Sequence, residues 1–304
     1  MGYKRAGYRV IGNCEIDSKI AEVYRRNLHP EISYVMDIRE FNTIDDLPDC
    51  LYELDVLDGS PPCSTFSTAG SRAKAWGVEK QFAEGQIRQR LDDLFFVYLE
   101  TVARLRPKVF VAENVTGLIE GKARGYVNEI ISKAKSIGYD IQLFKLNAAF
   151  MGVPQLRERV FFVGNRMGYP KLQLRFEEEP ILFGDVRSEH SGKMPGKVTM
   201  DRLSRKVRSD RHIGNITMRD IGKMTSFVTA IMWDDEVCRT VTTHKNIRAC
   251  DDTFMTDDDL VAVSSFPQDY DFGDRKVPFV CAMSVPPSMM ANIAHEIRGQ
   301  WLNG

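Results

Sequence analysis

The sequence lacks most features that mark secreted, membrane or metal-binding proteins. Its six cysteines are dispersed over 304 residues without a C-x-x-C pair, and no histidine pair accompanies them at zinc-finger intervals. Dispersed cysteines in a chain of this length favour a reducing compartment over a disulfide scaffold. No apolar run reaches the roughly 18 residues of a membrane helix, and the N-terminus has no apolar signal core. We therefore expect a cytoplasmic protein with no metal site and no membrane partner.

A large excess of one charge is also missing. The net charge is −1, from 41 basic and 42 acidic side chains, and this total argues against a nucleic-acid partner. The charges are unevenly distributed, however. Residues 187–223 hold ten Lys or Arg against four acids, whereas residues 250–274 hold eight Asp and no basic residue. Because a local basic surface can bind phosphates whatever the total charge, a nucleic-acid partner stays open.

The first half of the chain alternates short apolar runs with amphipathic stretches. The pattern predicts strands over residues 8–14, 54–57, 108–112, 139–146 and 160–164, and helices over residues 18–28, 91–105 and 125–137. This alternation indicates an α/β fold with a parallel, doubly wound sheet. Ligands bind such sheets at the carboxyl ends of the strands, so the residues that follow each strand are candidates for chemistry. After residue 165 the pattern gives way to turn formers, and a final helix is predicted over 288–302.

Three segments beside the predicted strands carry reactive or charged side chains. Cys63 follows one strand in a loop stiffened by two prolines, Glu113 ends another, and Arg157 and Arg159 share a face if their segment is extended. These are candidates for a nucleophile, a proton donor and a clamp for an anion or carbonyl. The plainer alternatives are a buried small residue, a turn acid and a solvated charged edge. A thiol hydrolase would want a histidine beside Cys63, and all five histidines lie outside these segments.

In this order and spacing, the segments resemble the central motifs of the DNA (cytosine-5) methyltransferases. The matching stretches are D-G-S-P-P-C-S-T-F-S at 58–67, V-A-E-N-V at 111–115 and Q-L-R-E-R-V-F-F-V-G at 155–164. The resemblance continues through R-T-V-T-T at 239–243, F-P-Q-D-Y at 266–270 and S-V-P-P at 284–287. It therefore runs through most of the chain, with residues 166–238 as the expected variable part.

The resemblance implies a Rossmann-like, S-adenosylmethionine-dependent methyltransferase domain with a smaller, mostly irregular or β target-recognition domain. We expect the catalytic core at residues 1–165, the target-recognition domain and hinge at 166–279, and a C-terminal helix returning to the core at 280–304. The implied partner is duplex DNA, with contacts expected from Arg202 to Arg219, and a cognate restriction endonuclease is a further candidate. We expect a monomer, associated with the nucleoid.

The resemblance also implies a mechanism. Cys63 would add to C6 of a cytosine flipped out of the duplex, which makes C5 nucleophilic toward the methyl group of S-adenosylmethionine. Glu113 would hold the N3 and amino edge of the ring, and Arg157 and Arg159 would orient its carbonyl. The polar loop at 70–90 would close over the base.

The implied cofactor site lies at the ends of the first strands. Glu15 would accept hydrogen bonds from the ribose hydroxyls, and Asp37 would receive the adenine amino group. Ile16 would pack on the adenine face, with Leu94 lining the same pocket. The full predicted set is Glu15, Ile16, Asp37, Ile38, Asp58, Leu94 and Ser284.

Three features depart from the family pattern. The chain begins with what resembles the helix after the family's F-x-G-x-G-G turn, so we expect the first strand and its loop to be missing and cofactor affinity to suffer. The final motif usually reads G-N-[AS]-V, whereas residues 282–285 are A-M-S-V. Asp258 and Asp259 stand where an Arg-Glu pair is usual. Two alternatives to an active DNA enzyme therefore stay open: a truncated or impaired homologue that binds DNA, and an RNA cytosine-5 methyltransferase.

Overall fold

The structure is a computed structural model that describes residues 1–62, 94–120, 124–222 and 229–303. The chain divides into two compact units, each assembled from separate stretches of sequence. The sheet unit comprises Arg9–Leu146, Glu158–Leu174 and His295–Gly304, and the helical unit comprises Met1–Tyr8, Asn147–Arg157 and Arg175–Ala294. The chain thus passes between the units more often than the three predicted regions imply.

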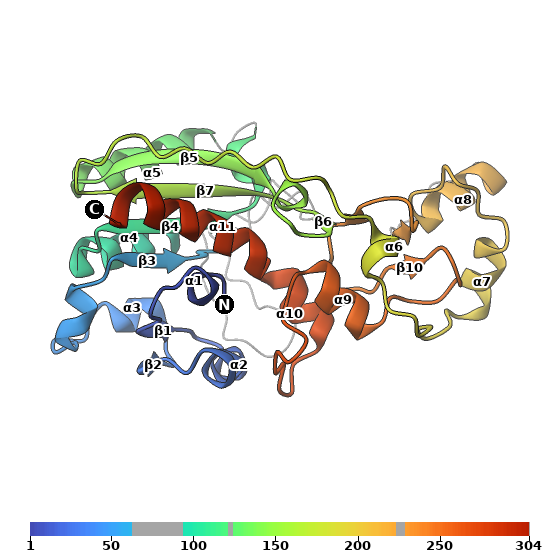
Figure 1. Ribbon diagram of the computed structural model, residues 1–304, viewed down its shortest axis with the longest axis horizontal. Coiled ribbons are helices and arrows are strands. Elements are labelled where there is room, and N and C mark those ends of the chain that lie inside the picture. The colour runs from blue at the N-terminus through green and yellow to red at the C-terminus, as the bar shows by residue number, and fades with distance from the viewer. Residues whose placement is uncertain (63–93, 121–123, 223–228, 304) are drawn as a thin grey trace. The chain divides into compact units, whose positions relative to one another are not determined.

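The sheet unit is built on a four-stranded sheet (Figure 1). Its order is β3 (Val56–Gly59), β4 (Val109–Asn114), β7 (Glu158–Asn165) and β5 (Asp140–Asn147). The strands β3 and β4 are parallel, as predicted, whereas β4 and β7 are antiparallel. A parallel connection needs a crossover, usually a helix, and the link from β5 to β7 contains only the short elements η4 and β6. The α/β class is therefore confirmed, with one strand reversed relative to the prediction.

A second, two-stranded sheet belongs to the same unit. Its strands β1 (Gly12–Cys14) and β2 (Ile32–Tyr34) are parallel and are joined by helix α2 (Ser18–Leu28). The predicted bounds of this helix are confirmed. Its N-cap is Asp17, whose carboxylate accepts a hydrogen bond from the Lys19 amide at 2.9 Å. In the part of the chain that the structure describes, no strand joins this pair to the larger sheet.

Two amphipathic helices contribute most of the core of the sheet unit. Apolar residues of α4 (Leu94–Leu105) and α5 (Arg124–Ser136) pack with the sheet around Phe95, Phe110 and Phe162. The helical period predicted from the sequence therefore marks the buried faces. The remaining short elements of this unit are α3 (Ile38–Phe41), η1 (Asp49–Tyr52), η2 (Thr116–Ile119) and the π-helical turn η5 (Arg298–Leu302).

The helical unit contains short helices and two-residue strands. The helices are α1 (Gly2–Arg5), η4 (Ala148–Phe150), α6 (Phe183–Val186), α7 (Lys197–Leu203), α8 (Ile213–Ile221), α9 (Asp257–Val263), α10 (Val277–Met283) and α11 (Pro287–Ile297). The last residues of α11, from His295, belong to the sheet unit. The strands pair in parallel, β6 (Gln155–Leu156) with β9 (Cys238–Arg239) and β8 (Ile231–Met232) with β10 (Ile247–Arg248). A small apolar core formed by Leu203, Ile213, Ile216 and Ile247 holds α7 and α8 together.

The stretch Val277–Leu302 is long and apolar enough to cross a membrane by length and composition alone. Its helices are interrupted at residues 284–286, and Met289, Ile293 and Ile297 are fully buried within the protein. Core helices of soluble proteins pass the same test, so this stretch is weak evidence for a membrane span.

Candidate active site

An ion pair joins Glu113, near the carboxyl end of β4, to Arg159 on β7. The Arg159 Nε lies 2.8 Å from Glu113 Oε1, and the two side chains are only 15% and 14% exposed. Burial lowers the pKa of the Arg159 guanidinium below its ordinary value, and the Glu113 carboxylate opposes this shift. A carboxylate fixed by a shielded cation can receive a hydrogen bond from an N–H group and still have its charge balanced. This pair is the polar centre at the end of β4.

The next residue, Asn114, fixes the start of the proline-containing loop. Its buried amide donates a hydrogen bond from Nδ2 to the Pro61 carbonyl at 3.0 Å, and its Oδ1 accepts one from the Val115 amide at 2.9 Å. Cys63 follows two positions after Pro61 and lies outside the described residues, as does the predicted closing loop at 70–90. No role was predicted for Asn114, although its place directly after Glu113 was an available signal.

The carboxyl end of β3 is packed against a tyrosine of α4. The Tyr98 hydroxyl lies 2.9 Å from the Leu57 carbonyl and 2.8 Å from the Val111 carbonyl, so it bridges β3 and β4. A Cβ on Gly59 would collide with the Tyr98 ring, so only glycine fits the strand end without a shift. This contact fixes the point where the chain leaves β3 at Gly59 and enters the loop Ser60-Pro61-Pro62. Asp58 itself is exposed at this strand end.

Arg157 has an environment different from the one expected. Its side chain is only 2% exposed, and Nη2 donates hydrogen bonds to the Ala282 carbonyl at 2.6 Å and the Ser284 carbonyl at 2.9 Å. Arg157 belongs to the helical unit, whereas Arg159 belongs to the sheet unit. The two arginines thus have different partners, because the chain passes from one unit to the other between them, and their common role at the pyrimidine carbonyl stays a prediction. Ser284, predicted at the cofactor, here accepts from Arg157 and donates its hydroxyl to the Val280 carbonyl at 2.7 Å.

Two predicted cofactor residues follow the adjacent parallel strands β1 and β2. Glu15 comes directly after β1, and its Oε1 accepts a hydrogen bond from the Asp17 amide at 2.9 Å. Asp37 caps α3 by accepting from the Arg39 amide at 2.8 Å, and its Oδ2 lies 3.2 Å from Arg39 Nη1. Desolvation, with the charges of Glu15 and Asp37, raises the pKa of the Cys14 thiol to about 12. Two carboxylates at one sheet edge suit a ligand with hydroxyl and amino donors, as a nucleoside has.

The predicted apolar contacts of the cofactor differ in exposure. Ile16 and Ile38 are partly exposed, and Ile38 also packs against the core of the sheet unit. Leu94 is 6% exposed at the first described residue of α4. The two isoleucines therefore offer accessible apolar surface next to the carboxylates, whereas Leu94 offers little.

The basic stretch expected to contact DNA is largely neutralised inside the helical unit. Arg208 pairs with Asp235 at 2.8 Å and with Glu236 at 2.7 Å, and its guanidinium lies over the Trp233 ring. Further ion pairs join Arg187 to Asp234, Arg205 to Asp201 and Asp220, Lys206 to Asp252, Arg211 to Glu236, and Arg219 to Asp210. Several of the acids come from outside the stretch, so the local excess of positive charge in the sequence overstates the free positive charge in the fold.

Comparisons with known proteins agree with the motifs. The family model described as C-5 cytosine-specific DNA methylase matches residues 1–299. Type II methyltransferase M.NgoPII of Neisseria gonorrhoeae is 32% identical over 193 residues, which are 61% of this chain and 52% of that protein. Type II methyltransferase M1.HphI of Haemophilus parahaemolyticus is 26% identical over 326 residues, covering 98% of this chain and 82% of that protein. The chain thus spans about half the length of M.NgoPII and 43% of M.FnuDI of Fusobacterium nucleatum.

Solved structures show the same fold. A prophage-encoded E. coli protein, described as a DNA modification methyltransferase, superposes with a TM-score of 0.72 at 17% identity, covering 100% of this chain and 95% of that one. Spodoptera frugiperda DNMT2 gives a TM-score of 0.66 at 15% identity, covering 97% and 95% of the two chains. With the family model matched along nearly the whole sequence, the chain belongs to the C-5 cytosine-specific DNA methylase family.

Proposed function

We propose that this protein methylates C5 of a flipped-out cytosine in duplex DNA, with S-adenosylmethionine as the methyl donor. The observation that carries the proposal is the Glu113–Arg159 ion pair, 2.8 Å long and shielded from solvent. Glu113 lies on the strand whose end is held by the hydrogen bond from Asn114 to Pro61, two positions before Cys63. The ion pair supplies a hydrogen-bond acceptor and a positive charge where a pyrimidine edge would need both.

In the proposed reaction, the Cys63 thiolate forms a bond to C6, and electron density moves to C5. Glu113 holds the N3 and amino edge and stabilises the proton at N3 as the adduct forms. Arg159 keeps the Glu113 carboxylate in place and assists the site electrostatically, and Arg157 holds the segment before it. S-adenosylmethionine supplies an electrophilic methyl group. C5 accepts this methyl group, and S-adenosylhomocysteine is left as the second product. Loss of the C5 and N3 protons to solvent and departure of the Cys63 thiolate then restore the aromatic ring.

The residues after β1 and β2 fit the cofactor by their chemistry. Glu15 and Asp37 supply carboxylates for ribose hydroxyls and an adenine amino group, and Ile16 and Ile38 supply apolar surface beside them. Asp58, Leu94 and Ser284 complete the proposed set. The relatives named above are Type II methyltransferases, which favours a cognate restriction endonuclease as partner and the bacterial cytoplasm, at the nucleoid, as the place of action.

Bisulfite sequencing of DNA from cells that express the full chain tests this function. We expect protected cytosines at one recurring sequence, and none in cells that express the Cys63→Ala variant. Equal conversion in both, with DNA binding by the purified protein intact, would instead support an impaired homologue that only binds DNA. Protection found in tRNA and not in duplex DNA would support the RNA alternative.

A further inference from the structure

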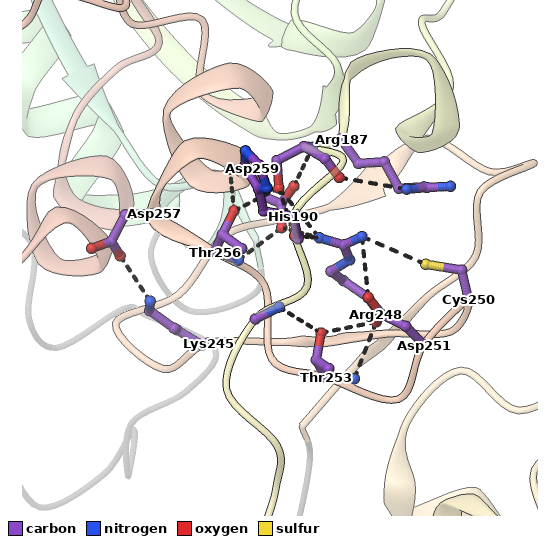
Figure 2. Close-up of polar contacts among 12 residues, drawn as sticks. Arg187, His190, Lys245, Arg248, Cys250, Asp251, Thr253, Thr256, Asp257 and Asp259 are labelled. Atoms are coloured by element: carbon purple, nitrogen blue, oxygen red, sulfur yellow. Dashed lines mark hydrogen bonds and ion pairs between the residues drawn. The ribbon is translucent and has the colours of Figure 1, made fainter.

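A buried ion pair between Arg248 and Asp259 holds in place the main chain that leads to residues 193–198. The side chains of Arg248 and Asp259 are 1% and 0% exposed, and Arg248 Nη1 lies 3.4 Å from Asp259 Oδ2. Asp259 Oδ1 accepts a hydrogen bond from the Ser188 amide at 2.7 Å, and Arg248 Nη1 donates one to the His190 carbonyl at 2.6 Å (Figure 2). Side chains from β10 and α9 thus hold the main chain at residues 188–190.

Two further hydrogen bonds extend this attachment to residue 193. The Gly192 amide donates to Thr253 Oγ1 at 3.0 Å, and the Phe254 amide donates to the Lys193 carbonyl at 3.0 Å. The backbone approaches so closely that a Cβ on Gly192 would collide with the Phe254 carbonyl oxygen. Residues 193–198 therefore begin at a fixed point.

Beyond that point the side chains face solvent. Met194 is 52% and Val198 67% exposed, and both Lys193 and Lys197 are exposed. Neither lysine has an ion-pair partner within the residues described by the structure. The segment ends in α7, where Leu203 is fully buried in the small core. It is thus anchored at both ends and presents two positive charges and two apolar side chains.

Resting on the proposed function, we infer that residues 193–198 form the contact surface of the helical unit for duplex DNA. The Lys193 and Lys197 ammonium groups bind backbone phosphates, and Met194 and Val198 pack against sugars or base edges. The charge of the paired arginines is already balanced by carboxylates, whereas Lys193 and Lys197 pair with no carboxylate among the described residues. Anchoring at both ends lowers the entropy cost of ordering the segment on DNA.

The test compares two double variants that each remove two positive charges. Binding of the full chain to duplex DNA of mixed sequence is measured across a salt series for wild type, Lys193→Ala/Lys197→Ala and Arg205→Ala/Arg211→Ala. We expect the lysine variant to bind roughly tenfold more weakly at 0.1 M salt and to lower the log–log salt slope by about 1.8, the value for two phosphate contacts. The arginine variant should stay within about twofold of wild type, because its charges are already balanced.

A third variant tests the contribution of the apolar contacts separately from that of the lysine charges. Met194→Ala/Val198→Ala should weaken binding and leave the salt slope unchanged. Equal losses in the lysine and arginine variants, or a larger loss in the arginine variant, would overturn the inference while leaving the proposed function standing. If the wild-type chain binds no DNA, both fall together.

Discussion

Replacing Glu113 by glutamine should lower the rate of methyl transfer about 10²–10⁴-fold, the usual contribution of a positioned acid or base. The substitution keeps the size of the side chain but removes its charge and its ability to carry a proton. The Glu113 carboxylate is fixed by Arg159 at 2.8 Å and shielded from water, so no solvent molecule replaces it easily. The measurement is single-turnover transfer of a labelled methyl group to duplex DNA.

The matched control for this variant lies on the neighbouring strand. Glu158→Gln makes the same chemical change at an exposed position, where the carboxylate pairs with Lys145 at 3.1 Å. It should leave the rate within about twofold of wild type. The thermal midpoint of both variants shows whether the chain remains folded. A folded Glu113→Gln variant with a rate close to wild type would contradict the role assigned to Glu113.

Replacing Arg248 by methionine should lower the free energy of unfolding by about 3–5 kcal/mol. The change leaves the fully buried Asp259 carboxylate without its cation, and uncompensated buried charges have this cost. It also removes the donor to the His190 carbonyl. Urea unfolding followed by tryptophan fluorescence measures the loss.

Two comparisons show whether the loss comes from the buried charge. Arg205→Met breaks the ion pairs with Asp201 and Asp220, whose shared arginine is 49% exposed, and it should cost about 0–1 kcal/mol. Arg248→Met/Asp259→Leu removes both charges and should recover part of the stability lost by Arg248→Met alone. A loss below about 1 kcal/mol for Arg248→Met, or no recovery in the double variant, would show that this ion pair does not hold residues 188–193 in place.

Most long helices and strands of the sheet unit follow from local patterns, whereas β2 and α3 were not predicted and the strand directions do not follow from the sequence. The apolar period predicted α2 over its observed bounds, because the same residues that set the period are buried in the core. The reversed strand β7 was not predicted, since apolar alternation is the same for parallel and antiparallel neighbours. Its direction depends on the short link from β5.

The site shows the same division between local and long-range information. Glu113 and Arg159 were both predicted, and the structure brings them together across β4 and β7. The partners of Arg157 were not predicted, because i, i+2 spacing gives a common face only within one strand, and β6 ends at Leu156 before β7 begins at Glu158. Asp259, noted in the sequence only as a departure from the family, proved to be the buried partner of Arg248 and part of the capping box of α9.

The free positive charge at the surface was the feature that the sequence predicted least well. A count over residues 187–223 includes Arg208 and Arg211 but omits their partners Asp235 and Glu236, which the fold supplies from outside that stretch. Lys193 and Lys197 have no distinguishing feature in the sequence. They stand out in the fold because six neighbouring cations of the stretch are paired with carboxylates, namely Arg187, Arg205, Lys206, Arg208, Arg211 and Arg219. The surface available to phosphate is therefore a property of the fold.

The central claim, a covalent mechanism through Cys63, is tested most directly by trapping. The full chain is incubated with S-adenosylmethionine and duplex DNA in which 5-fluorocytosine replaces cytosine, and the products are analysed by denaturing electrophoresis and peptide mass spectrometry. The fluorine cannot leave as the C5 proton does, so the adduct persists. We predict a protein–DNA adduct that maps to Cys63 and is absent from Cys63→Ala. A wild-type protein that binds this DNA without forming an adduct, or an adduct that persists in Cys63→Ala, would contradict the account.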